Sequence, residues 1–153
     1  MTNTPPKLWT KDFVITALAA FFVSFGFHIS MVTIAAYAIQ TYHASTSQAG
    51  LAAGMFIIGA LFIRLFVGYL IDLLGLKRLL LASLLIYILS SSLYLLEVNL
   101  SFLYINRFLH GAGMGMATTV TSTIVAHIVP PQRRGEGIGY FSLSPVLANC
   151  IGP

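Results

Sequence analysis

The sequence has very few charged residues: Asp, Glu, Lys and Arg together make up 8% of its 153 positions. Soluble globular domains carry about 25%. Water could not solvate a surface with so few charges, so the composition excludes an ordinary soluble domain and predicts an integral membrane protein. The single cysteine, Cys150, excludes an internal disulfide. The basic residues are scattered between apolar runs, which argues against a nucleic-acid-binding protein.

Acidic side chains are missing from the long apolar runs. The four acids stand at the ends of these runs, at Asp12, Asp72, Glu97 and Glu136. The sequence also lacks paired carboxylates, a metal-binding Cys/His cluster, a nucleotide-binding glycine loop and a Ser/His/Asp set. We therefore expect a protein that is not an enzyme and that holds no metal and no cofactor. Inside the runs, proton-coupled chemistry has only His28 and His110 to use as titratable groups.

Five apolar segments predict membrane-spanning helices, since a helix needs about 20 largely apolar residues to cross a bilayer. The predicted spans are residues 13–39, 49–70, 79–96, 102–129 and 138–153. The first is too long for a signal-peptide core, so we expect it to be retained. Short breaks between the segments favour antiparallel neighbours. The expected fold is an all-α integral membrane bundle of about five transmembrane helices.

Basic residues mark one side of this bundle. Three pairs fall on the same predicted side: Lys7 with Lys11 before the first segment, Lys77 with Arg78 in the second break, and Arg133 with Arg134 in the fourth. The other breaks contain no Lys or Arg. By the positive-inside rule the basic side is cytoplasmic, which predicts a multi-pass protein with a cytoplasmic N-terminus.

The second segment carries a stripe of residues at spacings of three and four, which places them on one helical face. Its members are Gly50, Gly54, Ile57, Leu61, Arg64, Gly68 and Asp72. The glycines predict close packing against another helix. Arg64 either faces that neighbour or extends toward the cytoplasmic interface.

The fourth segment contains Arg107, six residues past Ser101 and therefore about 9 Å into a core of about 30 Å. A charge facing lipid at that depth costs at least a few kcal/mol. We therefore expect Arg107 either to bind carbonyl groups of neighbouring helices or to line a path for substrate or protons. Gly111 shares its face, and His28 on the first segment is a candidate cavity residue.

The stretch "GYLIDLLGLKR" resembles the signature that joins helices two and three in the major facilitator superfamily. Gly68, Leu70, Asp72, Gly75 and Lys77 match that signature, while Leu73 and Leu76 replace its usual basic residues. "RFLHGAGMG" is similar to the family's fourth-helix pattern on Arg107, Gly111 and Gly113. The fifth segment is similar to the pattern of its drug/proton antiporters at Gly139, Ala148, Gly152 and Pro153, with Ala148 replacing a glycine.

The resemblance implies an incomplete N-terminal half of a twelve-helix transporter, a fragment whose C-terminal half is absent from residues 1–153. Such a transporter would export small molecules through the plasma membrane by alternating access, with protons as the candidate coupling ion. It implies a gating loop formed by Gly68, Asp72, Gly75, Lys77 and Arg78. Its partners would be the lipid bilayer, an unidentified substrate, and the missing half or another membrane chain.

Further roles follow from the resemblance alone. Arg107 would line the cavity and tune proton coupling, and Gly139 and Gly152 would pack the fifth helix against the other half. The alternative is a small membrane interaction protein without a transport cycle. Its docking surfaces would be the glycines of residues 50–54 and 111–115.

Overall fold

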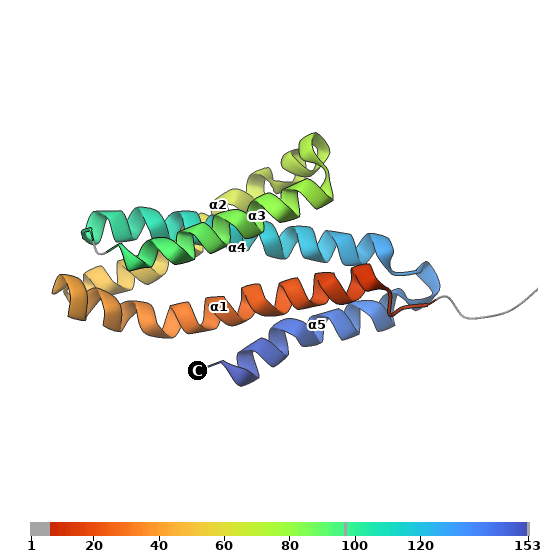
Figure 1. Ribbon diagram of the computed structural model, residues 1–153, viewed down its shortest axis with the longest axis horizontal. Helices are drawn as coiled ribbons and strands as arrows, with labels where there is room; N and C mark the ends of the chain where they lie inside the picture. The colour runs from red at the N-terminus through yellow and green to blue at the C-terminus, as the bar shows by residue number, and fades with distance from the viewer. Residues whose placement is uncertain (1–6, 97, 153) are drawn as a thin grey trace, which may run out of the picture.

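The computed structural model describes residues 7–96 and 98–152, which form an all-α bundle. Its helices are α1 (Lys11–Tyr42), α2 (Thr46–Leu74), α3 (Leu76–Ser92), α4 (Leu100–Ile128) and α5 (Arg134–Ile151), with short 3₁₀ helices η1 (Leu93–Leu95) and η2 (Pro131–Arg133). The described ranges contain no β-strand. The helices run up and down along one long axis (Figure 1). The predicted all-α fold is therefore confirmed.

Three helices begin beside a polar side chain that accepts a hydrogen bond from their first turn. Thr10 Oγ1 accepts from the Phe13 amide at 3.3 Å, and Asn99 Oδ1 accepts from the Phe102 amide at 2.8 Å. Ser45 and Gln48 form a reciprocal capping box at the start of α2. Because these caps are polar residues outside the apolar runs, α1, α2 and α4 begin before the spans that hydropathy predicts.

Gly75 alone separates α2 from α3. Its backbone has φ +78°, which glycine adopts without steric cost, and its amide donates to the Ile71 carbonyl at 2.8 Å. The polar break expected over residues 72–78 is therefore almost entirely helical. Asp72 lies in the last turn of α2, and Lys77 and Arg78 lie in the first turn of α3.

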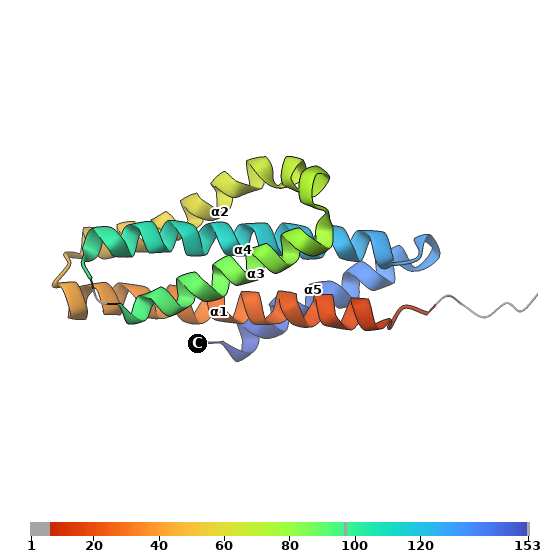
Figure 2. The same cartoon turned by 45° about the horizontal axis from the view of Figure 1, so that its top comes forward.

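The basic breaks gather at one end of the bundle, as the charge pattern predicts. The start of α1, the α2–α3 link and the α4–α5 link all lie at that end (Figures 1 and 2). We call it the basic end. There Arg133 binds Glu136 at 2.6 Å, and this contact holds the pKa of the Glu136 carboxyl below its usual range.

Helix α4 lies at the centre of the bundle and makes its most extensive contact with α2. Both helices run toward the basic end, so this pair is parallel. A Cβ on Gly111 would overlap the Phe56 carbonyl, and one on Gly115 would lie 2.5 Å from the Ala60 carbonyl oxygen. The two backbones touch at these positions, which only glycine allows. Gly111–Gly115 is therefore internal, and its interpretation as an external docking surface is wrong.

The face of α2 that packs on α4 is rotated away from the predicted glycine stripe. Its buried residues are Ala49, Ala52, Phe56, Gly59, Ala60 and Val67. A Cβ added to Gly50, Gly54 or Gly68 would have no atom of the described residues within 4 Å, and Leu61 is 57% exposed. Spacing correctly put the stripe on one face. Arg64 reaches α4 through Thr118, but no described helix packs against the glycines of the stripe.

Length and hydropathy identify residues 11–42, 46–74 and 76–93 as helices able to cross a membrane individually, whereas α4 and α5 qualify only as a pair bent by 115°. Helix α4 contains more Gly, Thr and His because its neighbours shield much of it from lipid. It has 29 residues and runs beside α2 and α3, so it shares their depth (Figure 2).

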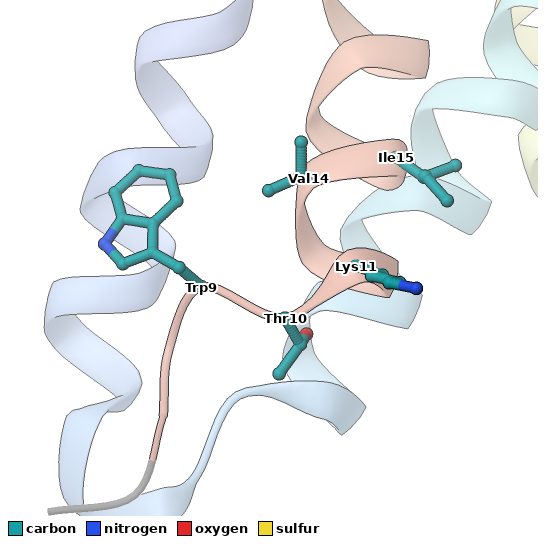
Figure 3. A pocket seen from close by; sticks show the side chains of 5 residues that line it. All are labelled: Trp9, Thr10, Lys11, Val14 and Ile15. Carbon is teal, nitrogen blue, oxygen red and sulfur yellow. The ribbon is translucent and has the colours of Figure 1, made fainter.

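An aromatic cluster lies at the basic end between α1 and α5. Figure 3 shows Trp9 directed toward α5 while Lys11 points away from it. The Trp9 ring lies 5.2 Å from the Tyr140 ring and 5.5 Å from the Phe13 ring. Trp and Tyr prefer the membrane–water interface, so this cluster is consistent with a basic end at the bilayer surface.

We predict that Gly111→Ala lowers the free energy of unfolding by about 1–3 kcal/mol, because the added methyl group would push α2 and α4 apart. The measurement is reversible unfolding of the purified chain in mild detergent. The control is Gly54→Ala, which meets no neighbour and should be neutral or slightly stabilising. Equal stability of Gly111→Ala and the wild type would show that this contact is looser than described.

Candidate functional site

The centre of the candidate site is Arg107, whose side chain is completely buried. Its Nε donates to the Ala52 carbonyl of α2 at 3.1 Å. One terminal nitrogen donates to Ser30 Oγ of α1 and, at 3.3 Å, to the Tyr94 hydroxyl of η1. The other contacts Met31 Sδ at 3.3 Å. A single side chain of α4 thus joins α1, α2 and η1.

Arg107 is held by neutral groups. Its guanidinium carbon lies 4.6 Å from the centre of the Phe56 ring, a cation–π contact that strengthens when water is excluded. In the described ranges the one ion pair recorded joins Arg133 to Glu136 at the basic end. The positive charge is therefore stabilised by a carbonyl, two hydroxyls, a thioether and an aromatic face. This arrangement fits the interpretation that Arg107 joins helices.

A hydrogen-bonded chain leads from Arg107 to His110. Tyr94 Oη accepts from Arg107 and lies 3.0 Å from His110 Nδ1. A hydroxyl group has one proton and two lone pairs, so Tyr94 can accept from Arg107 and still bond His110 in either ring tautomer. His110 Nε2 is buried and has no hydrogen-bond partner in the described part of the chain. His110 therefore supports Arg107 through Tyr94 rather than by direct contact.

A groove of about 380 Å³ adjoins this network between α1 and the end of α3. Ser30, Tyr94 and His110 belong to both the network and the wall of the groove. The rest of the wall combines Gly26, Ile29 and Ile34 with the hydroxyl-bearing Thr33, Tyr37 and Ser91. The groove could hold a small molecule, and two of its polar side chains, Ser30 and Tyr94, also bind Arg107.

His28 does not join the Arg107 network. Its Nδ1 lies 2.7 Å from the Ser24 carbonyl one turn back along α1, and its ring contacts Phe27 edge to face. Its other neighbour is Gly152 at the end of α5, where a Cβ would lie 3.2 Å from His28 Cβ. The two candidate cavity residues of the sequence, His28 and Arg107, thus lie in separate environments.

The predicted gating residues lie together around the α2–α3 link. Asp72, Lys77 and Arg78 are exposed there, as are Gly68 and Gly75. Asp72 is near the negative end of the α2 dipole, while Lys77 and Arg78 are near the positive end of the α3 dipole. Each charge opposes the dipole of its own helix, so helix stability does not explain their positions.

The fifth-helix motif is divided between two faces of α5. Ala148 is fully buried, and Gly152 lies against His28, so both face α1. Gly139 is exposed, with no atom within 4 Å of an added Cβ among the described residues. Pro153, the last residue of the motif, lies outside the described residues, as does Glu97.

Sequence reasoning missed Ser30, Tyr94 and Phe56, which contact Arg107, and Asn106 beside it. Tyr94 stands at the end of a predicted span, where a Tyr is typical of the membrane interface. Asn106, adjacent to Arg107, is buried and donates to the Ser90 carbonyl at 3.0 Å. A polar pair inside an apolar helix was the available signal for Asn106, whereas nothing in the pattern singled out Ser30.

A bundle of five mostly apolar helices that contains a buried arginine defines a polytopic α-helical membrane protein. Residues 16–153 match the family model of the Major Facilitator Superfamily. The chain belongs to the major facilitator superfamily, a family of membrane transporters.

Individual relatives agree with this assignment. Multidrug resistance protein 2 of Bacillus subtilis (strain 168) is 28% identical over 144 residues, which cover 94% of this chain and 36% of the relative. Monosaccharide-sensing protein 1 of Arabidopsis thaliana is 31% identical over 82% of this chain and 18% of the relative. Multidrug resistance protein 3 of Bacillus subtilis is 31% identical over 56% of this chain and 17% of its own length. The chain thus spans at most about a third of these relatives.

We predict that Arg107→Met destabilises the bundle by about 1–3 kcal/mol for each buried acceptor that loses its donor, the Ala52 carbonyl first. Arg107→Lys should recover only part of this loss, because an ammonium group cannot reproduce the guanidinium fork. Unfolding in mild detergent measures both. Arg78→Met, at an exposed position, is the matched control and should change stability by no more than about 0.5 kcal/mol. Similar stability of Arg107→Met and the control would contradict the role assigned to Arg107.

Proposed function

We propose that this chain forms part of the N-terminal transmembrane half of a small-molecule exporter that works by alternating access. In this arrangement the basic end faces the cytoplasm and the bundle lies in the plasma membrane, with protons as the coupling ion. The observation that carries the proposal is the open face of α2 that ends at Asp72. Its glycines have no described neighbour, while the opposite face of the same helix packs tightly on α4.

The charges around Gly75 support a gating role. Asp72, Lys77 and Arg78 are exposed at one corner and are each unfavourable for their own helix. A second transmembrane half that brings the N-terminal end of a helix to Asp72 would turn this local cost into a stabilising contact. Breaking and forming that contact would bias the transporter between its two states.

Export is favoured over import by two observations. Two relatives bear names that describe multidrug resistance, and the α5 pattern from Gly139 to Pro153 resembles that of drug/proton antiporters. The relative named as a monosaccharide-sensing protein makes sugar recognition the competing outcome. Proton coupling rests on the resemblance around Arg107, since the spans hold no acidic residue.

A membrane interaction protein without transport is the second candidate. The open glycines of α2 are the feature that favours it, because they could receive a helix of any other chain. Crosslinking separates the two functions. A stable homo-oligomer joined through the Gly50–Gly54 face, without saturable flux, would support the interaction protein and contradict the exporter.

The transport experiment is proton-driven flux of a fluorescent drug in proteoliposomes made with the longest product of this reading frame. We predict that Asp72→Asn lowers flux about tenfold or more in that product, because the exposed charge at the α2–α3 link would lose its partner. The same substitution in the 153-residue chain should leave thermal stability unchanged or slightly raised, because it removes a charge at the negative end of the α2 dipole. Glu136→Gln, an exposed acid at the same end, is the control and should transport normally. Normal flux in Asp72→Asn would refute the gating role.

A further inference from the structure

A second intramembrane arginine, Arg64, lines a groove of about 410 Å³ between α2 and α4. The other four residues of the wall all carry hydroxyl groups and all come from α4: Thr118, Thr119, Ser122 and Thr123. We call this the Arg64 groove. Arg64 is exposed, in contrast to the completely buried Arg107, so its charge is directed toward whatever fills the groove.

The Arg64 groove lies well inside the predicted span. Arg64 is ten residues before the end of α2, and Thr118 is ten residues before the end of α4. At 1.5 Å per residue, both are about 15 Å from the basic end. A charge facing hydrocarbon at this depth costs at least a few kcal/mol. The Arg64 side chain reaches sideways to α4, where Nη2 donates to Thr118 Oγ1 at 3.4 Å.

The hydroxyl groups of α4 present oxygen lone pairs to the groove, because their protons are already donated within the helix. Thr118 donates to the Met114 carbonyl at 3.0 Å, and Thr119 donates to the Gly115 carbonyl at 2.9 Å. Ser122 and Thr123 donate in the same way to the carbonyls of Thr118 and Thr119, each at 2.9 Å. This wall therefore accepts hydrogen bonds, whereas Arg64 opposite it can only donate them.

This separation of donor and acceptors defines the chemistry of a ligand. A guanidinium has five N–H donors, and in the described contacts only one hydrogen bond of Arg64, to Thr118, is recorded. A carboxylate or another oxyanion is the group that matches its free donors best. The row of hydroxyl oxygens beside it would accept N–H or O–H groups placed next to that anion. None of the described residues that line the groove is acidic, so none repels an anion there.

We propose that the Arg64 groove binds small amphipathic molecules that carry an oxyanion with an adjacent N–H or O–H donor. Arg64 holds the oxyanion, and the α4 hydroxyl row accepts from the donor. The volume of about 410 Å³ is within the range of small-molecule sites. The proposal rests on the proposed function in that it names the substrate class of the exporter, yet binding to the groove does not require transport.

The test is a fluorescence titration of the 153-residue chain in phosphatidylcholine nanodiscs. The probes are dansylglycine and dansylglycinamide, which share the fluorophore and the N–H donor but differ in the carboxylate. Wild-type protein should bind the acid about tenfold more tightly than the amide. Arg64→Gln should abolish this preference by weakening the acid alone, and Arg64→Lys should keep part of it. Thr119→Val removes an acceptor oxygen and should weaken both probes to a similar extent.

The matched control is Arg134→Gln, an exposed cation at the basic end outside the groove, which should leave both affinities unchanged. Size-exclusion chromatography and circular dichroism establish that Arg64→Gln is folded. Equal binding of acid and amide by the wild type would overturn the proposal, as would an acid preference that survives in folded Arg64→Gln. Because flux is not measured, a failed transport assay leaves this result intact, and a failed titration leaves alternating access intact.

An anionic lipid headgroup has the same chemistry, so a second arm uses nanodiscs that contain phosphatidylglycerol. Unchanged dansylglycine binding in these discs supports a free small molecule as the ligand. Loss of acid binding, together with phosphatidylglycerol that the wild type retains and Arg64→Gln does not in native mass spectrometry, would assign the groove to lipid. That outcome would overturn the small-molecule proposal.

Discussion

The contact between α2 and α4 determines the rest of this bundle. Two parallel helices approach until backbone meets backbone, at Gly111 against Phe56 and at Gly115 against Ala60. In this register, residues about 55 positions apart in the chain meet. Arg107 thereby reaches the Ala52 carbonyl, and Arg64 reaches Thr118. Side chains larger than hydrogen at these glycines would separate both pairs. One steric constraint thus positions both intramembrane arginines.

The two arginines illustrate how partners, rather than residue type, decide what an intramembrane charge does. Arg107 bonds to groups of three other elements, α1, α2 and η1, and uses its donors within the chain, so it behaves as a structural junction. Arg64 has the same charge on the outer side of the same helix pair and makes one long hydrogen bond. Arg107 is bonded within the chain and is inaccessible, whereas Arg64 remains accessible to a ligand.

Much of this arrangement could be predicted from the sequence, because hydropathy and charge act locally. The apolar runs located all five helices, and the paired Lys and Arg residues located the basic end. The rotation of α2 could not be predicted, because glycines at positions 50 and 54 and small residues at 52, 59 and 60 are equally compatible with close packing. Which set meets α4 depends on the glycines of a helix some 55 residues away.

The Arg107 network shows the same limit. From the sequence, Arg107 could either bind carbonyl groups of neighbouring helices or line a path for substrate or protons. The spacing of residues did not distinguish these two roles. Its partners Ser30 and Tyr94 come from two other segments and differ from their neighbours in no local pattern. They become recognisable only when three-dimensional packing brings three distant parts of the chain to one guanidinium.

The one-residue link at Gly75 has a consequence for how this sequence can change. With 3.6 residues per turn, inserting or deleting a single residue there would rotate α3 by about 100° relative to α2. Tyr87, whose hydroxyl donates to the Val23 carbonyl of α1 at 3.0 Å, would then face a different neighbour. The α2–α3 corner should therefore be far more sensitive to a change of length than a loop of several residues would be.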